Sequence, residues 1–425
     1  MKKFIKIALV ALLLLTVTVS AFACKTKDEY VSFTMKTGTD GTFKILQLTD
    51  IHLINSDRTS EYTELDFSLR DQWAMEAVRN VIDAAHPDMI MVTGDSVYNL
   101  DEVASSRPGL NTDNETSFKK FADFIDSFKI PWAFCFGNHD EEGDLKVQCK
   151  EDKTAAKKAL SAYLTSKNIK YCMYTDGPDD INGVGNYIIN VLNGDGSVNN
   201  ALVVFDSGSY IGRNNQWYEC VHDDQLEWYE KAIKHIASLN HTENVSSIVF
   251  QHIPFREYRE VLEIFQNALK QKGISWTNVI KADGTGEPYT VDISGETITY
   301  HGGVYNEGEI CCSYEGYWAG AHYDGGHEFQ KLLDLGSTKA VFCGHDHRNT
   351  FSFTYQGIRL TYGMSIDYSA NGLTPIGDNQ TIYSDIVQRG GTLITLNADS
   401  SIDVKQVPYS TDLYQMEMDR RGQTD

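Results

Sequence analysis

The most constraining feature of the sequence is a short apolar run that ends in a glycine and two histidines. Residues Ala340–Cys343 have the composition of a strand buried on both faces, and Gly344 allows a sharp turn after it. His345 and His347 follow, with Asp346 between them. This spacing can aim both imidazoles toward one point, as a metal ion requires. Taken alone, the pattern is more often a strand that ends in a surface turn.

Four other segments repeat this design. Each is an apolar run of strand length that ends in Asp, Asn or His: Lys44–His52, Met89–Asp95, Trp132–Asp140 and Ser247–His252. Continuous apolar runs indicate strands covered on both faces, and ligands bind where the carboxyl ends of such strands converge. A lone Asp or Asn at a strand end is usually a turn or cap residue, and a lone His252 is usually a core residue. The joint pattern instead predicts a metal site at one sheet edge.

The order of these motifs identifies a family resemblance. The chain resembles the calcineurin-like metallophosphoesterase superfamily in five motifs that occur in the same order. They are D-x-H at Asp50, G-D at Gly94, G-N-H-D at Gly137, the lone His252 and G-H-x-H at Gly344. The match runs from about Lys44 to Tyr362 and is most similar to the branch related to purple acid phosphatases. The resemblance implies an α/β fold, a four-layer αββα sandwich of two mixed β-sheets flanked by helices. It also implies two metal ions at the strand ends.

The resemblance assigns the candidate metal ligands position by position. One metal takes Asp50, His52 and His347, the second takes Asn138, His252 and His345, and Asp95 bridges both. Carboxylate and amide oxygens together with imidazoles suit Mn, Fe or Zn ions, and the lack of cysteine argues against a closed structural zinc site. A shared carboxylate sets two ions about 3.5–4 Å apart, where a hydroxide and a phosphate oxygen can bridge them.

Residues next to these ligands are candidates for other roles. The resemblance implies that His139 faces the leaving group, and we expect Asp140 to accept a proton from its imidazole. Asp346 is expected to orient its neighbours or bind the turn backbone.

Three further residues are candidate substrate contacts. Tyr98 occupies the position of a metal-binding tyrosine in purple acid phosphatases, but those enzymes lack the histidine present here as His52. Tyr98 is therefore expected to be an aromatic at the pocket edge rather than a ligand. Arg256 and Arg348 are suited either to hold a substrate phosphate or to be surface cations.

The remaining pattern predicts one large domain over residues 43–410. Helical periodicity is expected at Ser68–Ala85, Ser117–Phe128, Lys153–Ser166, Asp224–Leu239 and Glu257–Lys270. The alternation of strands and helices predicts a largely parallel first sheet. The two apolar segments within residues 186–207, separated by residues 193–196, predict a hairpin. Four strands between Thr350 and Val407 are expected to form an antiparallel part of the second sheet.

Three segments outside this pattern differ from it in composition. Residues 281–325 are rich in Gly, Tyr and acidic residues, and predict a substrate-gating insertion over the metal edge. Residues 24–42 are expected to be a tether or an edge strand, and residues 411–425 a polar tail.

The amino terminus predicts export. Lys2, Lys3 and Lys6 precede the apolar run Ile7–Val19, so that residues 1–23 read as a signal peptide. Cleavage before Cys24 would give a cell-surface lipoprotein, whereas cleavage without acylation would give a secreted or periplasmic protein. Export permits disulfides. Cys135 and Cys343 are expected to be buried thiols, and the other candidates for pairing are Cys149, Cys172, Cys220, Cys311 and Cys312.

The formal charge of −22 becomes −25 once the three lysines of the signal peptide are removed. Such a surface repels nucleic acid and anionic membranes, which favours small phosphorylated substrates and leaves a lipid on Cys24 as the only expected membrane contact. The pattern thus predicts an exported two-metal phosphoesterase that uses in-line attack of a metal-bridging hydroxide, most simply on phosphomonoesters. The alternatives are a phosphodiesterase or nucleotide pyrophosphatase, and a non-catalytic surface binding protein on the same fold. The sequence does not indicate an oligomeric state.

Overall fold

The computed structural model describes residues 24–54, 67–99, 113–211, 217–274, 288–293, 295–303, 327–369 and 389–409. The predicted signal peptide and the predicted polar tail therefore lie outside the described residues. Within the described ranges, no helix has the length and apolar character needed to cross a membrane. Cys135 and Cys343 are buried free thiols, as predicted.

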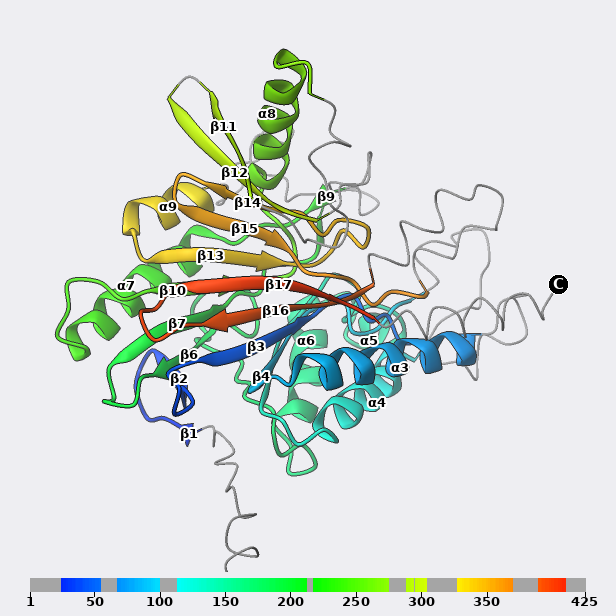
Figure 1. The fold of residues 1–425 in the computed structure, drawn as a ribbon. Coiled ribbons are helices and arrows are strands. Elements are labelled where there is room, and N and C mark those ends of the chain that lie inside the picture. The colour runs from blue at the N-terminus through cyan, green and yellow to red at the C-terminus, as the bar shows by residue number, and fades with distance from the viewer. Residues whose placement is uncertain are drawn as a thin grey trace, which may run out of the picture.

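Two mixed sheets form the centre of the molecule (Figure 1). The larger sheet has this strand order: β1 (Cys24–Lys25), β2 (Val31–Lys36), β6 (Tyr187–Leu192), β7 (Val198–Val204), β10 (Ser247–Phe250), β13 (Thr338–Cys343), β15 (Ile358–Tyr362), β14 (Ser352–Tyr355), β12 (Glu296–Gly302) and β11 (Tyr289–Ile293). The smaller sheet has the order β17 (Ile402–Pro408), β16 (Gly390–Leu396), β3 (Phe43–Leu48), β4 (Met89–Thr93) and β5 (Trp132–Cys135). A short ribbon pairs β8 (Tyr210–Ile211) with β9 (Trp217–Tyr218).

Helices cover the outer faces of both sheets. Those on the side of the smaller sheet are α3 (Phe67–Ala85), α4 (Asn114–Asp126), α5 (Asp144–Gln148) and α6 (Lys153–Leu164). Those on the other side are α7 (Asp223–Leu239), α8 (Glu257–Gln271) and α9 (Glu328–Leu335). Figure 1 shows α3 and α4 below the smaller sheet, α8 beside β11 and β12 at the top, and α9 beside β14 and β15.

Successive side chains of the central strands point to opposite faces of the sheet, so that each strand contributes to two separate hydrophobic cores. In β10, Ile248 and Phe250 join the core between the sheets, whereas Val249 joins the core under α7 and α8. Because both faces of the strand are buried, the sequence is continuously apolar. The four-layer α/β sandwich predicted from the sequence is confirmed.

The helices lie close to their predicted positions because their apolar faces and caps are local features. In α4, for example, the Asp113 carboxylate accepts a hydrogen bond from the Thr116 backbone N–H at 3.0 Å. Phe118, Phe121 and Ile125 recur on one face and are buried in the core.

The placement of the last two strands corrects the sequence prediction. β14 and β15 belong to the larger sheet, but β16 and β17 join the smaller sheet, where β16 pairs antiparallel with β3. The smaller sheet is therefore parallel only across β3, β4 and β5. β16 covers the edge of β3 that would otherwise expose unpaired backbone groups.

The predicted gating insertion also needs correction. Its residues 289–302 include the hairpin β11–β12, and β12 pairs antiparallel with β14. Val291, Ile298 and Tyr300 are buried in the core beneath α8, and Gly295 has the positive φ of +92° that its turn requires. This part extends a sheet rather than forming a lid, while residues 281–287 and 304–325 lie outside the described residues.

Candidate metal centre

The candidate site lies where the carboxyl ends of five strands from both sheets meet. The segments that follow β3 and β4 are tied by backbone hydrogen bonds, from Asp50 N–H to the Gly94 carbonyl and from His52 N–H to the Asp95 carbonyl, both at 3.1 Å. On the larger sheet, Gly344 N–H donates to the His252 carbonyl at 3.0 Å. These bonds bring the candidate ligands together, as the sequence pattern predicted.

Glycines permit the close approach of these segments. A Cβ atom on Gly344 would lie 1.9 Å from Thr49 Oγ1, and one on Gly137 would lie 2.1 Å from Asp95 Oδ1. The small residue at each motif thus allows two strand ends to touch.

Four of the seven candidate ligands have a left-handed backbone conformation that non-glycine residues rarely adopt. Their φ angles are +51° at Asp50, +55° at His52, +49° at Asp95 and +77° at His345. Each such residue costs roughly 1–2 kcal/mol. Strain of this kind gathers at functional sites, where it aims side chains inward.

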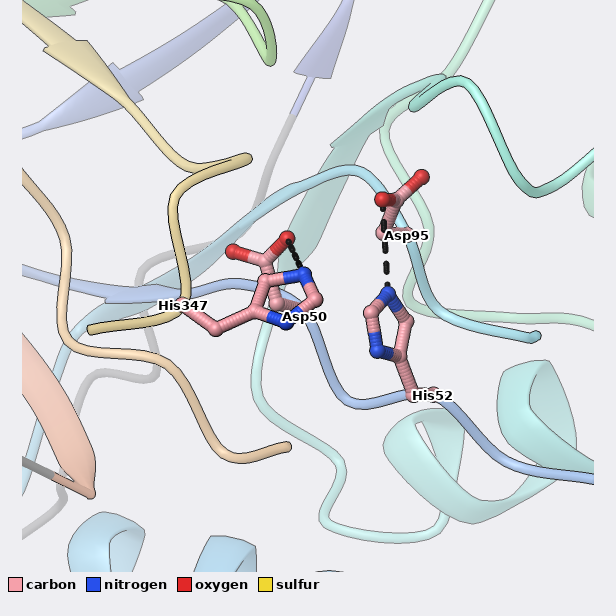
Figure 2. Close-up of side chains that lie close together, drawn as sticks. All are labelled: Asp50, His52, Asp95 and His347. Carbon is pink, nitrogen blue, oxygen red and sulfur yellow. Dashed lines mark hydrogen bonds and ion pairs between the residues drawn. The ribbon is translucent and has the colours of Figure 1, made fainter. Parts of the chain in front are cut away.

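The first group of ligands, which we call the Asp50 half, consists of Asp50, His52 and His347. Figure 2 shows His52 directed at Asp95 and His347 beside Asp50. The distances are 3.3 Å from His52 Nε2 to Asp95 Oδ2 and 3.5 Å from His347 Nε2 to Asp50 Oδ1. One donor atom from each of these four residues lies within 4.8 Å of the others, a spacing at which one ion can contact all of them.

The second group, the Asn138 half, consists of Asn138, His252 and His345. His252 Nε2 lies 3.1 Å from both Asp95 Oδ2 and Asn138 Oδ1. His345 Nε2 is buried and has no hydrogen-bond partner among the described residues. Burial and the nearby His252 hold the pKa of His345 well below its usual range, so the ring is neutral and one of its nitrogens has a lone pair for a metal ion.

Asp95 connects the two halves. Its Oδ2 atom is approached by His52 from one half and by His252 from the other. Burial alone would raise the pKa of Asp95, but His252 and His139 hold it well below its usual range. Hard oxygens, neutral imidazoles and one shared carboxylate fit two metal ions of the Mn, Fe or Zn type.

The environment of His139 differs from the prediction. Its Nδ1 atom lies 2.8 Å from Glu142 Oε2, so Glu142 and not Asp140 orients the imidazole. The Asp140 carboxylate instead accepts hydrogen bonds from the backbone N–H groups of Gly137 and Ser96, at 2.8 and 2.9 Å, and from the Ser96 hydroxyl at 2.6 Å. These donors surround Asp140 because it follows the tight turn, and they hold it away from the ring. The sequence signal for Glu142 is its i+3 spacing from His139.

The structure separates the other candidates by their surroundings. Tyr98 is buried, with its ring centroid 5.1 Å from that of His52 and 4.8 Å from that of His139, in the position of a pocket-edge aromatic. The half-exposed Arg256 pairs with Glu260 at 2.8 Å on α8, which corresponds to the surface alternative. Arg348 is half-buried directly after His347. Asp346 accepts a 2.6 Å hydrogen bond from the hydroxyl of Tyr362 on β15, a contact with a strand side chain rather than with the turn backbone.

Three residues at the site were missed by sequence reasoning. Tyr210 places its hydroxyl 3.2 Å from His139 Nε2, and Tyr218 places its ring centroid 4.2 Å from that of His345. No motif precedes either tyrosine. Asp367 lies against His52 and His347, and a weak signal for it exists, since it ends the short run Met364–Ile366 much as the other site carboxylates end theirs.

Comparison with known proteins places the chain in a family. Residues 43–349 match the family model described as calcineurin-like phosphoesterase. "Probable inactive purple acid phosphatase 28" of Arabidopsis thaliana is 27% identical over 78% of this chain and 72% of its own length. "Phosphatase DCR2" of Saccharomyces cerevisiae is 28% identical over 76% of this chain and 48% of its own length. A solved dimetal phosphatase from Danio rerio aligns with 87% of this chain and 99% of its own, at 10% identity and a TM-score of 0.40. On the strength of the family match across most of its length, this chain belongs to the calcineurin-like phosphoesterase family.

Proposed function

We propose that this protein hydrolyses phosphate esters with two metal ions held by the Asp50 half, the Asn138 half and Asp95. The observation that carries the proposal is the position of Asp95 Oδ2, within 3.3 Å of His52 Nε2 and 3.1 Å of His252 Nε2. Two ions bound there would supply charge neutralisation on the phosphate and activation of water.

The protein's own groups position the leaving side of the reaction. Glu142 accepts the Nδ1–H of His139, which directs Nε2 toward the site, where the Tyr210 hydroxyl lies 3.2 Å away. Although burial lowers the pKa of His139, the charges of Glu142 and Asp95 raise it above its ordinary value. A protonated Nε2 can donate to the departing oxygen, as a general acid does.

A phosphomonoester is the first choice of substrate, and a phosphodiester or nucleotide pyrophosphate is the enzyme alternative. The word "inactive" in the names of several relatives keeps a non-catalytic binding protein as the contrary hypothesis. This chain retains both ligand halves together with His139 and Glu142, and a protein that only binds phosphate has no use for a leaving-group acid. This set supports turnover.

The test is hydrolysis by the mature chain reconstituted with Mn²⁺, Fe²⁺ or Zn²⁺, on a panel of phosphate mono- and diesters, with metal content measured in parallel. We expect about two metals per chain and hydrolysis in wild type. Asp95→Asn should lower metal content in both halves and reduce the rate by roughly 10³-fold or more, because charge stabilisation by the ions is worth several kcal/mol. Two bound metals with no hydrolysis of any ester would favour the binding protein, and full activity of Asp95→Asn would refute the bridging role.

The proposed location is the cell exterior, on the basis of the amino-terminal pattern that ends at Cys24. If Cys24 carries a lipid, Cys24→Ser should move the protein from the membrane fraction to the medium. An unchanged distribution would support the plain secretory alternative.

A further inference from the structure

The carboxylate of Asp367 lies between two histidines of the same half. Its Oδ1 atom is 3.1 Å from His52 Nδ1, and its Oδ2 atom is 3.1 Å from His347 Nδ1. The side chains of Asp367 and His52 are almost fully buried, and that of His347 is 11% exposed. Each oxygen of one carboxylate therefore serves one imidazole.

This arrangement determines which nitrogen of each ring faces the metal site. An ionised carboxylate only accepts hydrogen bonds, so both Nδ1 atoms carry a hydrogen that they donate to Asp367. When each ring is in the neutral form that binds a metal ion, its lone pair is then on Nε2, the atom that lies 3.3 Å from Asp95 in His52 and 3.5 Å from Asp50 in His347. A single residue thus sets the tautomer and the orientation of two ligands.

Asp367 is itself held firmly. Its backbone N–H donates to Ser365 Oγ at 3.0 Å, its Oδ1 atom accepts from Ser369 N–H at 2.8 Å, and its carbonyl accepts from Arg389 Nε at 2.7 Å. The preceding Ile366 N–H donates to the Thr49 carbonyl at 3.2 Å, next to Asp50. The segment after β15 is therefore fastened to the end of β3, which brings the carboxylate beneath both rings.

The Asn138 half has a different support. His252 Nδ1 lies 2.8 Å from the Thr93 backbone carbonyl, a neutral acceptor. We propose that Asp367 is a positioning residue for the Asp50 half alone, and that it sets the affinity of this half for its metal ion. The inference rests on the proposed two-metal function and adds a residue outside the assigned ligands. A partner of this kind contributes about 10–100-fold to metal affinity.

The substitutions Asp367→Asn and Asp367→Ala separate the two contacts. An asparagine oxygen can still accept from one ring, but its amide would face the N–H of the other ring, so one imidazole loses its partner. Alanine removes both acceptors, and we expect it to have the larger effect. Asp126→Asn is the matched control, because Asp126 is also a buried carboxylate, accepting from Trp132 Nε1 at 3.1 Å at the opposite end of β5.

The measurement is a Co²⁺ titration of the metal-free chain, followed by absorption and calorimetry. Wild type and Asp126→Asn should show two binding events, and the Asp367 variants should weaken one event 10- to 100-fold while leaving the other unchanged. His345→Ala, which removes a ligand of the Asn138 half, should weaken the event that the Asp367 variants preserve. Two unchanged events, or equal weakening of both, would overturn the inference. Failure of wild type to bind Co²⁺ would instead refute the proposed function.

A second measurement needs no substitution of Asp367. Histidine ¹⁵N spectra of the metal-free wild-type chain, recorded at a pH high enough for both rings to be neutral and assigned with His52→Gln and His347→Gln, report which ring nitrogen carries the hydrogen. We expect the Nδ1–H form at both residues. The Nε2–H form at either residue would show that Asp367 does not orient that ring, even if its variants fail to fold.

Discussion

The two halves of the candidate metal centre use similar ligands but rest on different supports. Each half has two histidines and one oxygen ligand, and both share Asp95. In the Asp50 half the outer nitrogens of both rings contact the Asp367 carboxylate, whereas in the Asn138 half His252 contacts the Thr93 carbonyl. A charged acceptor makes the stronger hydrogen bond and raises the basicity of the imidazole. Ligand identity alone therefore does not set the two affinities, and we expect the Asp50 half to retain its ion longer under chelation.

A second contrast concerns buried carboxylates near the two halves. His347 and His52 hold the pKa of Asp367 well below its usual range, although burial acts to raise it. Glu141, on the loop that carries Asn138, is as deeply buried, and there burial raises the pKa to about 7 in spite of Lys157. One carboxylate is thus stabilised in its charged form and the other in its neutral form.

The largest effect that separates the halves is expected from Gly344→Ala. Its Cβ would lie 1.9 Å from Thr49 Oγ1 and 2.8 Å from Asp50 Oδ2, so Asp50 must move. We expect loss of one metal per chain and a fall in hydrolysis of roughly 10³-fold or more, with the Asn138 half still able to bind. Gly194→Ala is the control, since no described atom lies within 4 Å of its added Cβ. Retention of two metals in Gly344→Ala, measured by elemental analysis, would contradict the packing argument.

A smaller effect, confined to chemistry, is expected from His139→Ala. Both metals should stay bound, while hydrolysis of an alkyl phosphate falls about 10²–10⁴-fold through loss of general-acid help. A nitrophenyl phosphate should lose less, because its leaving group needs little protonation. Glu142→Gln should change rates in the same direction but less, since glutamine still accepts from Nδ1 without the charge.

Kinetics on the two substrates, with metal analysis, check this assignment. An equal loss on both substrates would indicate phosphate binding or electrostatics in place of proton donation. Loss of metal in His139→Ala would show that His139 is a ligand.

The smallest effect concerns stability and the carboxylate of Glu141. Its folded-state pKa of about 7 lies above the ordinary value of 4.5. The neutral carboxyl group therefore contributes to the free energy of unfolding below pH 4.5, and this contribution is lost as the pH rises from 4.5 through 7. Because glutamine does not ionise, Glu141→Gln should abolish this pH-dependent decrease, which amounts to at most about 3 kcal/mol in the free energy of unfolding. Denaturant unfolding from pH 5 to 8 measures it, with the exposed Glu243→Gln as control. Parallel pH profiles of wild type and Glu141→Gln would show that Glu141 ionises freely in the folded chain.

The sequence by itself determined the layers, the helices and the residues brought to the metal edge. Apolar strands that end in Asp, Asn or His are local signals, and a parallel arrangement brings their ends together wherever the strands lie in the sheet. Gly344 and Gly137, which pack against Asp50 and Asp95, belong to the same short motifs as the ligands.

Only the tertiary structure decided which groups support these residues. His52 and Asp367 are 315 residues apart in the chain. Their contact depends on the segment after β15 of the larger sheet being fastened to the end of β3 of the smaller sheet, through the hydrogen bond from Ile366 N–H to the Thr49 carbonyl. His139 takes Glu142 as its partner because Gly137 N–H of the turn and the N–H and hydroxyl of Ser96 from the segment after β4 already occupy Asp140. Hydrogen-bond partners depend on competition among all nearby donors and acceptors in three dimensions, which no local pattern of residues contains.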